Sequence, residues 1–216
     1  MSKNAVWQDD DWLLLLQLYL RKPVGVKPLY SRDMVNLSLE LHIAPQALLS
    51  RMQQIARLET PRIERIWQTY SGNSRRLARA VGLLRQMKGF GAAETFYDGV
   101  EMQETFEKDF RPLHEDERFS PVMLILILNL YFQLTPATMV TETPEVQELA
   151  RMIKVKPADV VMVMMTYQQF DPYLRHESPI ESVLQQPCQH IWRRFAQMEP
   201  NVLDAYAKEL EEFFKN

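Results

Sequence analysis

The sequence has very few of the residues that carry most enzymatic chemistry. Its 216 residues include one cysteine, Cys188, and six glycines. One cysteine excludes an intrachain disulfide, and four dispersed histidines (His42, His114, His176 and His190) give no zinc-ligand spacing. The sequence also contains no glycine-rich phosphate loop and no Gly-x-Ser-x-Gly elbow. We therefore predict a protein that is not an enzyme and uses no metal or cofactor, with Cys188 packed in a core rather than acting as a nucleophile.

Long apolar runs are missing as well. The longest, Val122 to Leu134, is interrupted by Asn129 and Gln133 and is shorter than the roughly 20 residues that cross a membrane. The first residues, MSKNAVWQDDDW, lack the basic region and apolar stretch of a signal peptide. We therefore expect a cytoplasmic protein without a membrane partner.

Proline and charge are both unevenly used. Thirteen prolines against six glycines favour helices delimited by prolines over glycine-rich hairpins. Residues 1–100 carry 14 basic and 9 acidic side chains, a balance of +5, whereas residues 101–216 carry 11 and 19, a balance of −8. Such a division suggests a different partner for each half or a contact between the halves. Chance variation in charge is the alternative.

A shift of 112 residues aligns the chain with itself. Under this shift WLLLLQLYL (12–20) falls on LILILNLYF (124–132), and NLSLELHIAPQALLSRMQQIARLE falls on ELARMIKVKPADVVMVMMTYQQFD. Identical residues meet at seven pairs of positions in these stretches: Leu14/Leu126, Leu16/Leu128, Leu18/Leu130, Tyr19/Tyr131, Leu37/Leu149, Pro45/Pro157 and Met52/Met164. We interpret this register as a tandem duplication.

The predicted fold is all-α, with two tandem-duplicated helical units. The units cover 1–111, the basic half, and 121–216, the acidic half, and a linker covers 112–120. Each unit has a helix-turn-helix-like core of three helices plus one or two further helices, expected near 73–88 and 92–110 in the first unit and near 179–198 and 201–214 in the second. The stretch VVMVMM favours a strand by propensity, but its counterpart ALLSRM makes it the third helix of the second unit.

The second copy also resembles a known family through several short segments. LILNLYFQLTP, EVQELARMIKVKPADVV, YQQFDPYLR and IWRRFAQMEPNVLDAYAKEL occur in that order. They resemble the helical N-terminal region that precedes the nuclease domain in many bacterial HNH endonucleases of the restriction type. The matching positions span most of residues 123–214 and include Leu130, Tyr131, Leu149, Ala150, Pro157, Val160, Phe170, Asp171, Pro172, Trp192, Phe195 and Leu203.

This sequence departs from the family in two ways. The arginine before the proline motif is missing, with Lys154 and Lys156 nearby, and none of the histidines has an HNH-like setting. The resemblance therefore implies a helical, DNA-associated module without its nuclease.

The third helix of the first copy carries a candidate reading surface for DNA. Glutamine can pair with adenine, and arginine with guanine or phosphate. The predicted DNA-binding residues are Gln46, Ser50, Arg51, Gln53, Gln54 and Arg57, supported by the arginines Arg75, Arg76 and Arg79. The alternative is an ordinary solvated face.

The second copy replaces these outer positions with apolar residues. Met162, Val163 and Met165 cannot contact phosphate, so we predict that they form a protein interface. Two functions follow as hypotheses. One is a non-enzymatic DNA-binding or regulatory protein, whose first unit contacts duplex DNA and whose second unit mediates assembly with another protein or a second copy. The other is a protein-interaction module without a nucleic acid partner.

Overall fold

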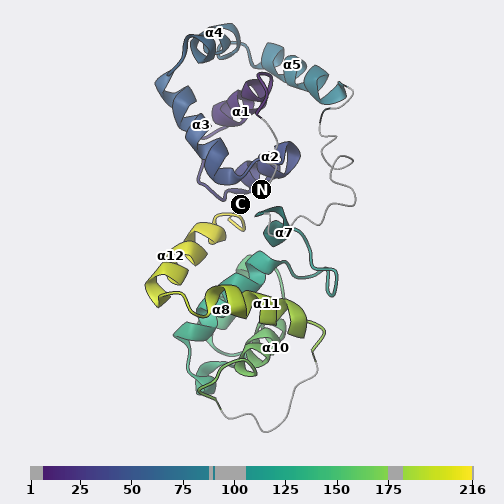
Figure 1. The fold of residues 1–216 in the computed structure, drawn as a ribbon, viewed down its shortest axis with the longest axis vertical. Helices are drawn as coiled ribbons and strands as arrows, with labels where there is room; N and C mark the ends of the chain where they lie inside the picture. Colours follow the sequence, from purple (N-terminus) through teal and green to yellow (C-terminus); the bar gives the residue numbers. More distant parts are fainter. Residues whose placement is uncertain (1–6, 88–89, 91–105, 175–181, 216) are drawn as a thin grey trace. The chain divides into compact units, whose positions relative to one another are not determined.

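The computed structural model describes residues 7–87, 90, 106–174 and 182–215, and these residues form helices and no strand. This confirms the all-α prediction. The chain divides into two compact units, Met1–Thr105 and Phe106–Asn216 (Figure 1). Within the described part, no helix combines the length and the apolar character that crossing a membrane would require.

The first unit is built around its first helix. Its described helices are α1 (Asp11–Leu20), α2 (Arg32–Leu41), α3 (Pro45–Arg57), α4 (Pro61–Tyr70) and α5 (Ser74–Gln86). Leu14, Leu15 and Leu16 of α1 are at most 2% exposed, and all four other helices pack against α1. A helix that is apolar on nearly all sides must be covered on all sides to leave water.

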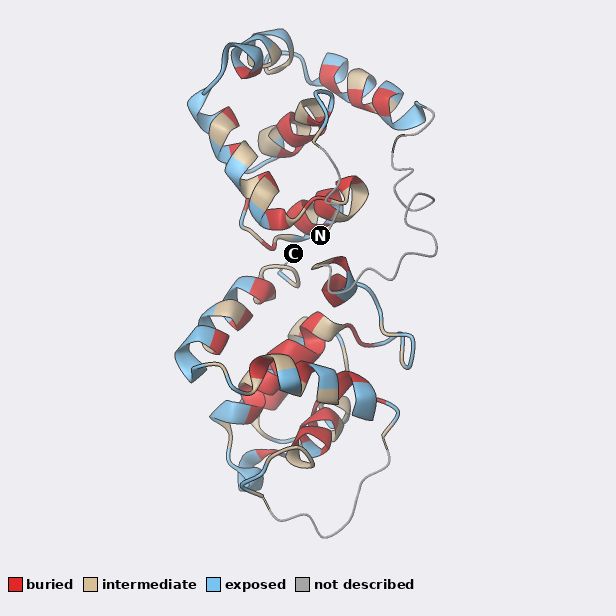
Figure 2. Ribbon diagram, viewed as in Figure 1, coloured by how far each residue is buried: buried red, intermediate tan, exposed pale blue. Residues whose placement is uncertain are grey.

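The second unit has the same organisation around α8. Its helices are α7 (Phe106–Phe110), α8 (Pro121–Gln133), α9 (Pro144–Ile153), α10 (Pro157–Gln168), α11 (Gln185–Phe195) and α12 (Pro200–Glu211), with a short 3₁₀ turn, η1, at Pro136–Thr138. Nine of the 13 residues of α8 are buried (Figure 2). The helices α9, α10, α11 and α12 pack against α8, and the short α7 contacts it as well.

Proline marks helix starts as the sequence predicts. It stands in the first turn of α3, α4, α8, α9, α10 and α12, where its missing N–H has no helical partner to lose. The VVMVMM stretch lies in α10 and is helical, as expected from its alignment with α3. One helix was not expected: α4 begins where Thr60 Oγ1 accepts a hydrogen bond from the Ile63 N–H at 3.3 Å.

The turns before α3 and α10 share one backbone geometry. His42 and Lys154, which stand 112 residues apart, both have left-handed backbone conformations, with φ of 54° and 62°. The hydrogen bonds that close these turns run from Ile43 N to Ser38 O (3.1 Å) and from Val155 N to Ala150 O (3.0 Å). Each turn therefore ends one helix and begins the next within three residues.

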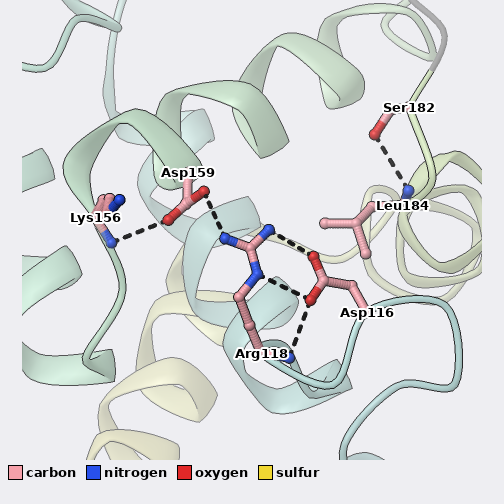
Figure 3. A network of polar contacts seen from close by, with 6 residues as sticks. All are labelled: Asp116, Arg118, Lys156, Asp159, Ser182 and Leu184. Carbon is pink, nitrogen blue, oxygen red and sulfur yellow. Dashed lines mark hydrogen bonds and ion pairs between the residues drawn. The ribbon is translucent and has the colours of Figure 1, made fainter.

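The predicted linker, 112–120, lies within the second unit, because the unit boundary falls between residues 105 and 106. Phe119 is 1% exposed, and Arg118 pairs with Asp116 (Nη2–Oδ2, 2.7 Å) and with Asp159 of α10 (Nη1–Oδ1, 3.2 Å) (Figure 3). An ion pair thus connects this segment to the first turn of α10. Of the helix expected over 92–110, residues 91–105 lie outside the described residues, and only α7 is seen.

The central position of α8 gives a test of the core. Leu128 is fully buried, so Leu128→Ala should lower the free energy of unfolding of the second unit by about 2–5 kcal/mol through lost burial and a cavity. Trp192, the only tryptophan in this unit, reports its unfolding in urea by fluorescence. The control, Val202→Ala, removes a side chain that is 48% exposed and should have little effect. Equal effects of the two substitutions would contradict a core built around α8.

Candidate functional site

The outer face of α3 presents only part of the predicted DNA-binding set. Ser50, Gln53 and Arg57 are exposed, whereas Gln54 is half-buried. Gln46 is exposed, but its Nε2 donates a hydrogen bond to the hydroxyl of Tyr30 at 2.8 Å. Of the predicted residues on α3, Ser50, Gln53 and Arg57 are therefore the ones most accessible to a ligand.

Arg51 is held by its own unit. It is half-buried, its Nη1 donates to the Ala47 carbonyl at 3.2 Å, and its guanidinium carbon lies 4.4 Å from the ring centroid of Trp7. A cation over an indole ring is stabilised by electrostatic attraction to the ring. Arg51 would lose this attraction if it left Trp7 to contact DNA. Trp7 lies far from Arg51 in the sequence, so no local pattern predicts this contact.

The arginines of α5 belong to a different part of the first unit. Arg75, Arg76 and Arg79 are exposed, and the guanidinium of Arg76 lies 5.4 Å from the ring centroid of Tyr70. Both α3 and α5 pack against α1, and in Figure 1 they lie on either side of it, joined through α4. The predicted residues thus occupy two surfaces, one on α3 and one on α5. Residues 51–87, which include all of them except Gln46 and Ser50, hold eight arginines and two acidic residues.

The predicted apolar interface on α10 is wrong for Val163. This residue is fully buried in a helix that packs against α8, α9 and α11, so its own unit covers it. Met162 is half-buried, and Met165 is 43% exposed. The alignment with α3 could not show this, because the burial of Val163 depends on how the other helices of the unit pack around α10.

The segments that carry the family resemblance form the core of the second unit. The rings of Tyr131, Phe170 and Trp192 cluster, with Trp192 6.0 Å from Tyr131 and 6.4 Å from Phe170 between centroids. The Tyr131 hydroxyl donates to Asp171 Oδ2 at 2.7 Å. Burial, the hydrogen bond to Asp171 and the charge of that carboxylate all raise the pKa of Tyr131. The Phe-Asp-Pro motif therefore holds the helices together here.

A groove with a volume of about 370 Å³ lies between α8, α9 and α12 of the second unit. Its lining combines apolar, acidic and basic side chains: Leu126, Asn129, Leu130, Gln133, Glu145, Glu148, Leu149, Met152, Asp204, Lys208, Glu211 and Lys215. Both lysines are paired, Lys208 with Asp204 (2.6 Å) and Lys215 with Glu212 (2.7 Å). Among the described residues, Glu145 and Glu148 form no ion pair. The groove is therefore acidic.

The electrostatics of this groove act on Glu211. Burial raises the pKa of Glu211, and the negative charges of Asp204 and Glu148 raise it further, against the opposing effect of Lys215 and Lys208. Asp204 is the better-satisfied acid, since hydrogen bonds from Lys208, Asn129 and Gln133 lower its pKa. The groove thus has an excess of carboxylate charge that its own lysines do not cancel.

A smaller groove, of about 140 Å³, lies between α1, α2 and α5 in the first unit. Eight of its lining residues come from α1, from α2 or from the position directly after α1: Leu14, Gln17, Leu18, Arg21, Asp33, Asn36, Leu37 and Glu40. Adding 112 to each number gives all eight residues of the larger groove that come from α8 and α9. The two grooves thus occupy the same position in the two units.

The two grooves differ in charge pairing. In the first unit Arg85 of α5 forms a bidentate pair with Glu40 (Nε–Oε1, 2.5 Å; Nη2–Oε2, 2.8 Å), and Arg21 pairs with Asp33 (2.8 Å). The arginines of the chain itself therefore satisfy the acids of the smaller groove.

The described part of the structure holds no candidate metal site. No three His, Cys, Asp or Glu residues there lie close enough to hold a metal ion together. Cys188 is buried in α11, as predicted. Burial raises the pKa of its thiol to about 12.

Comparison with family models, with curated proteins and with solved structures found no match to this chain.

The environment of Cys188 makes it a probe of the core. Because the thiolate is the reactive form, native protein at pH 8 should react with a disulfide reagent such as Ellman's reagent at least about a hundredfold more slowly than protein unfolded in urea. No other cysteine contributes to the signal. Rapid and complete reaction of the native protein would contradict the burial of this helix face.

Proposed function

We propose that this chain is a non-enzymatic binding protein made of two duplicated helical units, and that its first unit binds duplex DNA. The duplication is supported by the left-handed turns at His42 and Lys154, which stand 112 residues apart and are closed by equivalent hydrogen bonds. It is further supported by the two grooves, whose linings correspond residue by residue over two helices under the same shift.

The observation that carries the DNA-binding proposal is the exposed polar face of α3. This helix follows α2 after the three-residue turn His42–Ala44, an arrangement found in helix-turn-helix proteins. Ser50, Gln53 and Arg57 reach solvent from it. These side chains can donate to base edges and to phosphates, and they replace the wider set predicted from the sequence.

The exposed arginines of α5 would contact phosphates in this proposal. Arg75 and Arg79 are one turn apart on one face of α5, and neither forms an ion pair within the described residues. Cations that neutralise phosphates release counterions, so their contribution falls as salt rises. We assign them affinity without sequence preference.

A fluorescence-anisotropy titration with a labelled random-sequence duplex tests the proposal. We expect binding by micromolar protein at about 50 mM salt that weakens steeply by about 200 mM. Arg75→Ala/Arg79→Ala should weaken binding and reduce the salt slope by about 2, one for each lost phosphate contact. The matched control, Arg151→Ala/Arg193→Ala, removes two exposed arginines of the second unit and should leave binding unchanged.

Absence of salt-dependent binding in the wild-type protein would reject the DNA-binding proposal. Equal losses in the two double variants would show that binding follows overall charge and would reject the assigned surface.

The second candidate is a protein-interaction module without nucleic acid. The acidic groove of the second unit favours it, because a surface of that charge repels phosphate. The two functions are compatible if each unit has its own partner.

A further inference from the structure

We propose that the groove between α8, α9 and α12 binds an arginine-bearing, basic segment of a partner polypeptide. This site is separate from the DNA-binding face proposed for the first unit and does not depend on it. It rests on the correspondence between the two grooves and on the charges that remain unpaired in the larger one.

In the first unit, an arginine of the same chain occupies the smaller groove. Arg85 enters from α5 and bonds both carboxylate oxygens of Glu40, at 2.5 and 2.8 Å. Two parallel hydrogen bonds of this kind use the planar fork of arginine, which lysine cannot reproduce. The acidic wall of the groove is therefore complementary to a guanidinium group, and within this unit the chain supplies that group itself.

The second unit has a different set of charges in its groove, because Met152 stands at the position of Glu40, the acid that binds Arg85 in the first unit. Gln133 stands at the position of Arg21, and Glu145 at the position of Asp33. Glu148 at the position of Asn36 adds a carboxylate. The third wall also differs, since α12 lines this groove in place of the C-terminal end of α5, and Arg85 has no counterpart among the residues that line it. The outcome is a larger groove in which Glu145 and Glu148 form no ion pair within the described residues, whereas Asp33, at the position of Glu145, pairs with Arg21.

The rest of the lining suits an arginine side chain. Leu130, Leu149 and Met152 provide an apolar floor against which the aliphatic stem can pack while the guanidinium reaches Glu145 and Glu148. Four acids against two lysines give the lining a formal charge of −2. An anionic ligand is therefore disfavoured, and a cation gains Coulomb energy on entering.

The length of the groove points to a polypeptide rather than a single small cation. Along α12 the lining runs from Asp204 to Glu211, about 10 Å at the helical rise of 1.5 Å per residue. On α9, Glu145 and Glu148 lie on the same face, three residues apart. A segment with arginines about one turn apart can address both walls together.

Calorimetric titration of the full chain tests the site. The probe is an alanine-based helical peptide of about 12 residues with arginine at every fourth position, end-capped to remove terminal charges. We expect one peptide per chain, with affinity that falls as salt rises. The same peptide with lysine in place of arginine should bind more weakly, because an ammonium cannot form the bidentate pair.

Variants locate the binding. Glu145→Gln/Glu148→Gln keeps the side-chain shapes and should weaken peptide binding about tenfold or more. The matched control, Glu115→Gln/Glu117→Gln, removes the same charge from exposed residues outside the groove and should bind like wild type. Circular dichroism checks that each variant has wild-type helicity.

Three results would overturn the proposal: no peptide binding by the wild type, equal losses in both double variants, or binding of spermine as tight as that of the peptide. The last result would identify a general cation trap. Arg75→Ala/Arg79→Ala should leave peptide binding unchanged, so the outcome here is independent of the DNA experiment.

Discussion

The rest of this structure depends on the burial of one apolar helix in each unit. Helix α8 has nine buried residues among 13, and α1 carries three consecutive leucines that are almost inaccessible. An amphipathic helix can rest on a surface, but a helix that is apolar on all sides needs a ring of partners. The surrounding helices supply that ring, and within the described residues their outward faces are where we place the candidate functions. This is why the candidate sites are helix faces and grooves between neighbouring helices.

The contrast between the two units lies in the residues that line their grooves. The same positions on the first two helices line a groove in each. In the first unit Arg85 and Arg21 satisfy the acids of that groove, so the basic surface of the unit is left to α3, α4 and α5. In the second unit Glu145 and Glu148 form no ion pair within the described residues, and α8, α9 and α11 pack against α10 and leave most of its apolar side chains buried. Duplication followed by a change in a few polar residues would give two units with partners of opposite charge.

The sequence alone predicts the helices well, because local rules govern their ends. Prolines at 45, 121, 144, 157 and 200 each begin a helix, and the alignment of Pro157 with Pro45 correctly makes VVMVMM helical against its strand propensity. Side-chain environments are predicted less well. Val163 is predicted as an outer-face residue because it aligns with Arg51, but its own unit buries it, and Arg51 itself stacks on Trp7. The grooves were missed for the same reason. Their residues come from helices that no local pattern brings together. Once the lining of one groove is known, however, adding 112 to its residue numbers identifies the matching positions of the other.

The central claim, that both units carry the same groove and that Arg85 closes the first one, is tested most directly by opening it. Arg85→Ala leaves Glu40 without its partner and opens a groove whose lining positions on α1 and α2 correspond to those on α8 and α9, although Glu40 itself corresponds to Met152. Titration of this variant with the arginine peptide should give two peptides per chain by calorimetry, where the wild type gives one. A stoichiometry that stays at one in a correctly folded variant would contradict the equivalence of the two grooves.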